Sequence, residues 1–265
     1  MPFRLIVALI LCLFCSARLV VAQDMMRYID VNSPEMTTAE MTREQVAALA
    51  AAATPDHPAD FTGKRLSGLD LSGLNLSGAV FRAARLNKTR LVEAKLDGAV
   101  LDQAWMLGAD LSHASLRHAS IFVAQMLRVH LDGADLSGAR IVSDLTGASL
   151  VGAKLVGANL AADMKNQSMG LIHAVLKSAN LDKADLQNAD LSRAELAFAS
   201  LRQANLSNTI LQHVDLGGAD MTGANVSGAD FAGADLASAR LVAPVGLKAA
   251  RNFDKALNRD RLLTQ

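Results

Sequence analysis

The sequence has few cysteines, few aromatic residues and no net charge. Its two cysteines, Cys12 and Cys15, both lie near the start of the 265-residue chain. Beyond them, a disulfide or a cysteine-based metal site is excluded, so stability must come from other interactions. Aromatic residues form only 4% of the chain, which fits a narrow interior filled by leucine and alanine.

The charges balance, with 26 lysines and arginines against 26 aspartates and glutamates. A strongly basic surface would have pointed to nucleic acid, and an acidic excess to a cationic partner. Neither is present, so the composition gives no support for a nucleic-acid partner.

What the chain does have is a repeat of five residues, which is clearest over residues 215–241. A small residue, usually alanine, stands two places before each large apolar residue of the repeat. A period of five is neither the 3.6 of a helix nor the 2 of a strand, so it indicates stacked units that cannot bury their apolar side alone. The large apolar residues of this stretch are Leu216, Met221, Val226, Phe231, Leu236 and Leu241.

Four five-residue sides can close a square, so we expect the chain to return above itself every twenty residues. Leu181 should then lie directly above or below Leu201, with the alanines pointing inward beside them. The remaining positions face water. Glycine often follows two places after the large residue, as at Gly73 and Gly78, where a corner with positive φ would select it.

This A(D/N)LxG-like pattern resembles the pentapeptide-repeat family over residues 59–241. The resemblance implies an all-β solenoid, a right-handed quadrilateral parallel β-helix, which we expect over residues 59–243. It implies no single function, because members of the family have many different roles.

Residues 1–22 have the features of a signal peptide. Arg4 precedes an apolar run over residues 5–14, and small residues end the segment at Ala22. The alternative is a membrane anchor that stays attached, although the run is short for a membrane span. We expect cleavage near Ala22 and a periplasmic or secreted protein.

Helical caps are expected at both ends of the solenoid, because its first and last coils would otherwise expose their apolar interior. In the N-terminal segment, residues 23–58, the capping-box pattern from Thr37 to Glu40 predicts a helix over residues 40–53. In the C-terminal segment, residues 244–265, apolar residues at helical spacing predict a helix over residues 247–263. The N-terminal helix could instead bind a partner.

Two residues of the expected C-terminal helix are candidate contacts between protein copies. The resemblance to the family implies that such an element can join two rods into a homodimer, here through Phe253 and Leu257. Capping of the chain's own last coil is the alternative.

The five-residue register breaks once along the chain. Leu145 follows four residues after Ile141, Met164 follows four after Leu160, and the original frame returns at Leu171. Residues 165–170, between Met164 and Leu171, should leave the wall as a loop. Loops on rigid scaffolds often carry recognition. The alternative is a tolerated defect in the repeat. The candidate contact residues of this loop are Lys165, Asn166, Gln167, Ser168 and Met169.

Trp105 replaces the usual polar residue on the outer wall, with Arg85 one coil before it and Gln125 one coil after. A surface tryptophan beside an arginine is a plausible contact residue. It could equally pack under the N-terminal segment, residues 23–37. The histidines and stacked carboxylates are interpreted as wall residues, because a flat wall has no pocket to shift their pKa values. We therefore expect no catalytic residue, metal or cofactor.

These features favour a non-enzymatic exported rod that acts as a scaffold or binds an unknown protein, without membrane insertion after signal cleavage. The family resemblance suggests a second possibility, a cytoplasmic protein that mimics DNA and protects DNA gyrase. Balanced charge and the expected signal peptide both weigh against it. A module attached to an enzyme is the third possibility.

Overall fold

The computed structural model describes residues 30–165 and 172–265 of the chain. The helices and coils described below lie within residues 31–265, which form one compact unit, and the expected signal peptide lies outside the described residues. Within the described residues, no helix is both long and apolar enough to span a bilayer.

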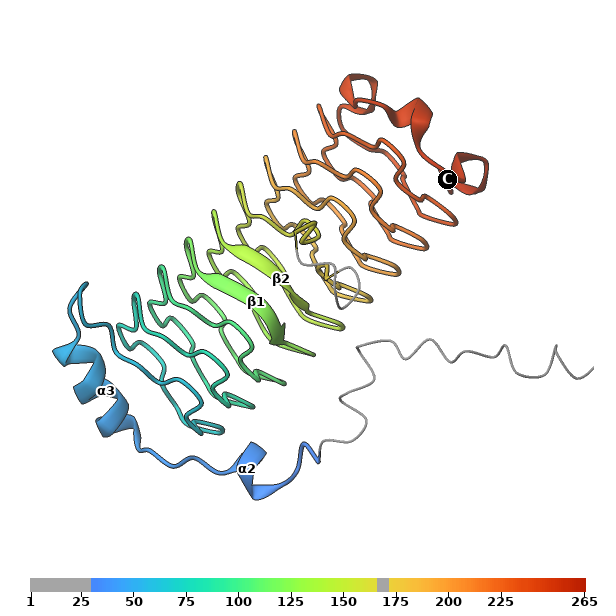
Figure 1. Cartoon of the computed structure of the whole chain (residues 1–265). Coiled ribbons are helices and arrows are strands. Elements are labelled where there is room, and N and C mark those ends of the chain that lie inside the picture. Colours follow the sequence, from blue (N-terminus) through green and yellow to red (C-terminus); the bar gives the residue numbers. More distant parts are fainter. Residues whose placement is uncertain (1–29, 166–171) are drawn as a thin grey trace, which may run out of the picture. The chain divides into compact units, whose positions relative to one another are not determined.

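The unit formed by residues 31–265 is a stack of coils in which successive coils pair in parallel (Figure 1). Most paired residues lie twenty apart, as in Asp70 with Arg90 and Trp105 with Gln125. Continuous strands form at one place only among the described residues, where β1 (Ser120–Gln125) pairs with β2 (Arg140–Asp144). Elsewhere one residue of each side makes a bridge, and a turn follows. The predicted twenty-residue return is confirmed.

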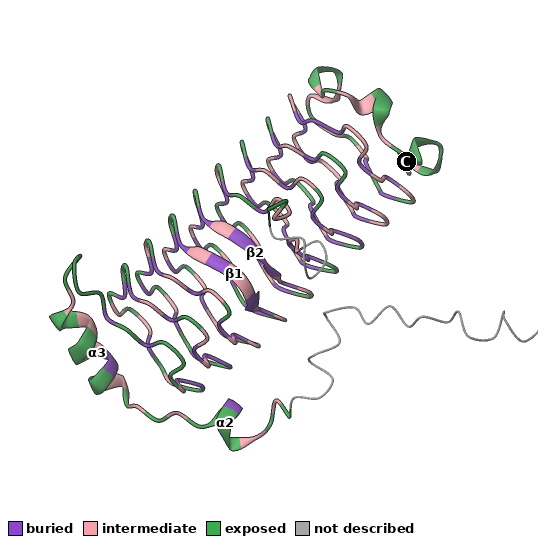
Figure 2. Ribbon diagram, in the orientation of Figure 1, coloured by how far each residue is buried: buried purple, intermediate pink, exposed green. Residues whose placement is uncertain are grey.

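The interior is filled as the repeat predicts, and buried residues recur along every coil (Figure 2). Leu181, Leu201 and Ala204 are all fully buried. The rings of Phe61 and Phe81, twenty residues apart, stack with 4.9 Å between their centroids. Each coil therefore buries its large and small side chains against those of the next coil, which the hydrophobic effect favours.

Most corners of the coils have left-handed backbone, two places after the large residue. Gly73 has a φ of 70°, but His113 and Phe198 adopt the same conformation with φ of 59° and 60°. Bulky corner side chains lean over a glycine of the next coil. A Cβ added at Gly218, for example, would lie 2.6 Å from Cδ1 of Phe198.

The N-terminal side of the stack carries two helices, α2 (Pro34–Thr37) and α3 (Arg43–Ala52). The expected capping box at Thr37 and Glu40 is wrong, because Thr42 and Gln45 form the box that begins α3. Glu40 instead pairs with the first coil, where its side chain accepts a hydrogen bond from the backbone of Arg65 at 3.2 Å.

On its inner face, α3 contributes Val46 to the same hydrophobic core as the coils. Arg43 fixes the helix to the first coil by donating to the carbonyl oxygens of Asp70 and Ser72, at 2.6 and 2.8 Å.

The C-terminal segment is not the expected α-helix over residues 247–263. It contains three short 3₁₀ turns, η2 (Leu247–Ala249), η3 (Phe253–Lys255) and η4 (Arg259–Arg261). They bulge from a final coil whose sides are six residues long, which bridges to the preceding coil (Figure 1). The bridging residues of this coil are Val245, Arg251, Leu257 and Leu263.

The helical reading failed because a six-residue side also places apolar residues three apart. Leu247, Ala250 and Phe253 pack against the core from successive positions of this kind. Extending the pairing also gives partners to backbone groups of the preceding coil, which an α-helix could not do. The N–H of Leu236, for example, donates to the carbonyl of Leu257 at 3.1 Å.

The first shortening of the register is confirmed within β2, where Arg140 and Asp144, its first and last bridging positions, are four places apart instead of five. The second expected shortening, which would place Met164 in the interior, is wrong. Met164 is 55% exposed and does not fill the interior.

An insertion leaves the wall at this place instead. Asp144 pairs with Val175, 31 residues later, and an antiparallel bridge joins Asp163 to Ile172 within the inserted segment. The expected return of the frame at Leu171 lies outside the described residues.

Candidate interaction surfaces

Trp105 and Arg85 are neighbours across one step of the stack, as predicted. Arg85 Nη1 donates to the carbonyl of Gly63 at 3.4 Å. Among the described residues, cation–π contacts join Arg140 to Phe122 and Arg259 to Phe253, but none joins Arg85 to Trp105. Trp105 is half-buried on the wall.

The N-terminal segment lies against the same wall, one coil before Trp105. The side-chain amide of Asn87 donates to the carbonyl of Met36 at 3.1 Å, and its oxygen accepts from the N–H of Leu107 at 3.0 Å. Met36 is buried there. These contacts join Met36 to Asn87, and the alternative that Trp105 packs under residues 23–37 stays a prediction. Residues 23–29 lie outside the described part of the chain.

Only the first residue of the predicted recognition loop, Lys165, falls within the described residues. Its N–H donates to Asp163 Oδ1 at 3.0 Å. Asn166, Gln167, Ser168 and Met169 lie outside the described part.

The base of the insertion is fixed to the wall. Asp163, with a side chain only 8% exposed, pairs with Arg140 Nη2 at 3.3 Å. The Arg140 guanidinium lies 4.1 Å from the centroid of the Phe122 ring. A shallow hollow of about 470 Å³ opens beside this pair.

Phe253 and Leu257 do not form one contact face. The Phe253 ring meets Phe231 edge to face with 5.4 Å between centroids, so it packs onto the last coils. Leu257 stands at a wall position and is 54% exposed.

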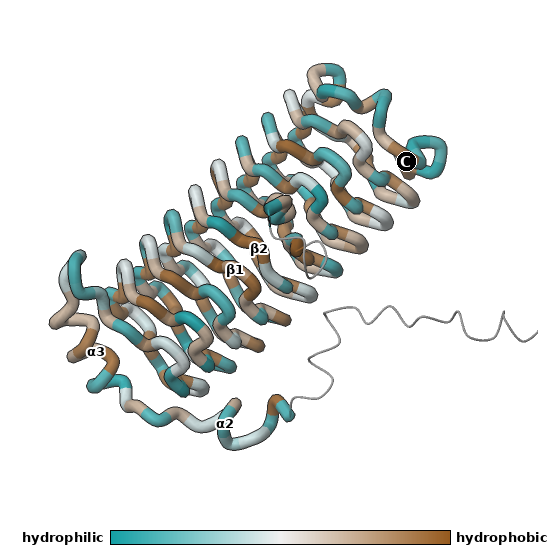
Figure 3. The backbone as a smooth tube through the Cα atoms, viewed as in Figure 1, coloured by the Kyte–Doolittle hydropathy of each residue, from teal (hydrophilic) through white to brown (hydrophobic). Residues whose placement is uncertain are grey.

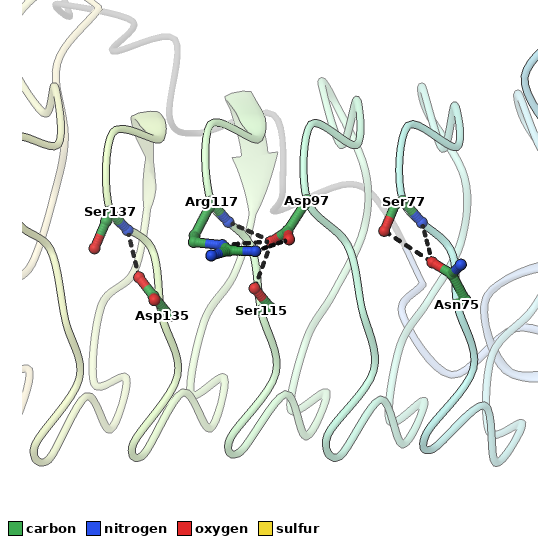
Figure 4. A network of polar contacts seen from close by, with 7 residues as sticks. All are labelled: Asn75, Ser77, Asp97, Ser115, Arg117, Asp135 and Ser137. Atoms are coloured by element: carbon green, nitrogen blue, oxygen red, sulfur yellow. Dashed lines mark hydrogen bonds and ion pairs between the residues drawn. The ribbon is translucent and has the colours of Figure 1, made fainter. Parts of the chain in front are cut away.

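The wall carboxylates hold the backbone of the coils in place. Figure 4 shows one such column, in which Asp135 Oδ1 accepts from the N–H of Ser137 at 3.0 Å. Asp97 accepts from the hydroxyl of Ser115 and pairs with Arg117 Nη2 at 2.5 Å.

Arg117 keeps Asp97 ionised. Its hydrogen bonds outweigh partial burial, so the pKa of Asp97 is held below its usual range. A carboxylate kept ionised and engaged in this way is a poor general acid. No group of three or more potential metal ligands occurs among the described residues.

Sequence reasoning missed two exposed apolar features. Phe198 is 71% exposed at a corner, and the signal was available, because a phenylalanine occupies a position that glycine, polar residues or smaller apolar residues take in other coils. The other is the rim of the last coil, where Val245 and Leu263 are exposed together with Leu257. The six-residue period of residues 245–263 was the signal for that rim.

Known proteins share both the sequence pattern and the fold. The family model for pentapeptide repeats matches eight copies, over residues 59–98, 94–121, 124–161, 171–208 and 199–237. None of the curated protein sequences compared with the chain matches it.

Among solved structures, the chain is similar to HetL of the cyanobacterium Nostoc sp. strain PCC 7120, a pentapeptide repeat protein involved in the regulation of heterocyst differentiation. The identity is 27% over 84% of this chain and 95% of HetL, with a TM-score of 0.50. Rfr23 of the cyanobacterium Cyanothece 51142 is 26% identical over 44% of this chain and 91% of its own, with a TM-score of 0.26.

A trypsin-treated variant of QnrB1, a plasmid-mediated fluoroquinolone resistance protein, is 18% identical over 65% of this chain and 94% of its own, with a TM-score of 0.43. The family model covers more than half of the chain, and the stacked coils have the twenty-residue return that the repeat requires. The chain therefore belongs to the pentapeptide repeat family and has its fold, the right-handed quadrilateral β-helix.

Proposed function

We propose that the protein is a non-enzymatic, exported rod that binds a partner protein through its outer surface, at a corner of the coils. The observation that carries the proposal is Phe198, which has the largest exposed fraction of the exposed large apolar side chains among the described residues. Exposed aromatic residues are enriched among the energetic centres of protein interfaces.

The surroundings of Phe198 leave its ring accessible. Its left-handed backbone is the conformation that the fold also gives to other corners, such as His113. The neighbouring surface is flat, because Ala197 and Gly217 are small and Gly218 lies under the ring. A partner could therefore approach the ring closely.

Site-specific photo-crosslinking in cells tests this proposal. A benzophenone amino acid at position 198 should give one discrete protein adduct, and the same probe at Glu93, another left-handed corner, should not. Equal adducts at both corners, or none at position 198, would contradict a specific contact. Turnover of a substrate by the purified protein, lost when a wall carboxylate is changed, would refute the non-enzymatic assignment.

The predicted loop is tested in the same cells by deleting residues 165–170. If the insertion contributes to recognition, the adduct at position 198 should weaken. If the insertion is a tolerated defect, the adduct should persist.

Export is supported by the sequence of residues 1–22 alone. Cell fractionation and N-terminal sequencing test it, with a mature N-terminus expected near Gln23.

An intact N-terminus in the cytoplasm would revive the gyrase alternative. Against that alternative, wall carboxylates are neutralised across coils, as in Asp70 with Arg90 at 3.2 Å. We expect no protection of DNA gyrase from inhibitors in a supercoiling assay.

A further inference from the structure

The last coil gathers exposed apolar side chains. Val245, Leu257 and Leu263 are 57%, 54% and 45% exposed, and together they are called the apolar rim. They make up half of the exposed large apolar residues among the described residues. The others are Leu49, Met164 and Phe198.

The apolar rim lies on three different walls. Val245 bridges to Asn225, Leu257 to Asp235 and Leu263 to Arg240, and these three partners belong to three different sides of the preceding coil. A partner lying along one wall could cover only one rim residue. A surface that meets the end of the stack could contact all three.

The same coil is basic. It carries five exposed cations against two carboxylates, Asp254 and Asp260. Arg251 lies beside Asp230 of the preceding coil and helps to lower the pKa of that carboxylate, and none of the other four cations forms an ion pair with any described residue. Figure 3 shows hydrophilic residues in the protruding turns of this coil. The five cations are Lys248, Arg251, Lys255, Arg259 and Arg261.

Two arginines are already held in place at the surface. Arg251 Nε donates to the carbonyl of Gly228 at 2.9 Å, and Arg259 Nη1 donates to the carbonyl of Asp254 at 3.2 Å. The guanidinium of Arg259 also lies 5.1 Å from the centroid of the Phe253 ring. An apolar hollow of about 460 Å³ opens beside Lys248, between Pro244 and Leu247.

The excess of positive charge on the last coil decides which kind of partner can bind there. A second copy meeting it tail to tail would bring ten cations against four carboxylates, and like charges at an interface are repulsive. Nucleic acid would satisfy the cations but would leave the exposed leucines without an apolar partner. An anionic bilayer offers phosphates to the cations and an apolar boundary just beneath them.

We propose that the last coil docks end-on to the surface of an anionic lipid bilayer. The five cations contact lipid phosphates, and the apolar rim reaches the boundary between headgroups and acyl chains. No part of this coil crosses the membrane. The proposal is independent of the corner contact at Phe198, so either one can fail alone.

Vesicle flotation with the full chain tests the docking. The protein should float with vesicles of phosphatidylcholine containing about one-third phosphatidylglycerol and remain unbound with phosphatidylcholine alone. Raising NaCl from about 0.05 M to about 0.5 M should release it, because salt screens exposed charges. Each basic residue near an anionic surface contributes roughly fivefold to partitioning, so the double variant Lys255→Glu, Arg261→Glu should bind at least about tenfold more weakly.

Matched variants separate this end from the rest of the chain. Leu257→Gln with Leu263→Gln should also reduce binding at least about tenfold, whereas Lys183→Glu on a wall corner and Leu49→Gln on α3 should not. Binding that ignores lipid charge and the end variants would locate it elsewhere, for example in residues 1–22, and would overturn the proposal. Absence of binding would also overturn it, as would a lipid-free dimer in sedimentation that the end variants dissociate.

Discussion

Leu191 is fully buried in the interior of the stacked coils, whereas Asp190 lies on the wall beside it. Leu191→Ala should leave a cavity between coils and lower the free energy of unfolding by roughly 2–5 kcal/mol. Asp190→Ala removes the acceptor of the Ser192 N–H, at 2.9 Å, and should cost only about 0.5–1 kcal/mol. Urea denaturation of both variants measures the difference. The reverse order would mean that the inward and outward positions are misassigned.

Asp97 should make the stability depend on pH. Its pKa in the fold lies below the ordinary value because Arg117 donates hydrogen bonds to it. The stabilisation is therefore present above about pH 4 and is lost as the pH falls through the lowered pKa. Asp97→Asn should be less stable than wild type at pH 7, and it should lose less stability on acidification. Urea midpoints at about pH 7 and about pH 3 test this, and identical shifts in both proteins would contradict it.

At this scale the repeat predicted well which residues are buried. It did not predict the contacts of individual wall side chains. Trp105 and Arg85 lie on adjacent coils as expected, yet the Arg85 guanidinium donates to a backbone carbonyl rather than stacking on the indole. The period fixes a residue's place on the wall, but the rotamer depends on which backbone acceptors compete nearby.

At the scale of elements, the start of α3 tests how the N-terminal helix is fixed. Thr42 accepts from the N–H of Gln45, so Thr42→Ala should lower stability by about 1 kcal/mol through loss of the N-cap. Thr37 donates from its hydroxyl to the carbonyl of Ser33 at 2.9 Å and caps no long helix. Thr37→Ala is therefore the matched control in chemical denaturation, and a larger loss there than at Thr42 would restore the capping box expected from sequence.

The last coil should depend on Phe253. Its ring packs on Phe231, so Phe253→Ala should cost roughly 1–3 kcal/mol. The largely exposed Phe198 is the control, and Phe198→Ala should change the unfolding free energy by less than about 0.5 kcal/mol. Equal losses in differential scanning calorimetry would show that Phe253 does not hold the final coil.

Both terminal elements show where sequence patterns were ambiguous. Thr37 with Glu40 and Thr42 with Gln45 fit the same capping motif, and only the pairing of Glu40 with Arg65 decides between them. In the last coil, apolar residues at the third and sixth places of a side pack inward, as at Leu247 and Ala250, and this spacing also fits one face of a helix. Helix and six-residue coil differ in their backbone partners, which the apolar pattern does not encode.

For the whole molecule, the twenty-residue return and the break in register both follow from the period, but the extent of the insertion does not. Met164 fits a shortened side by spacing alone, yet its side chain is exposed and does not pack in the interior of the coils. The residues after Leu160 form an insertion, and the wall resumes at Val175 directly above Asp144. Apolar spacing cannot distinguish an insertion from two compensating shifts of the register.

The central claim is that the coils stack in continuous register across this insertion, and engineered disulfides test it directly. Lys154 bridges to Asp185. If Met164 filled the interior of the coils instead, as the sequence predicted, Lys154 would lie beside Val175. Bridged residues in a parallel ladder lie within disulfide reach, with Cα atoms about 5 Å apart. In a Cys12→Ser, Cys15→Ser background, Lys154→Cys with Asp185→Cys should oxidise to a cross-link that shifts mobility on a non-reducing gel. Lys154→Cys with Val175→Cys should stay reduced, and cross-linking of that pair instead would contradict the account.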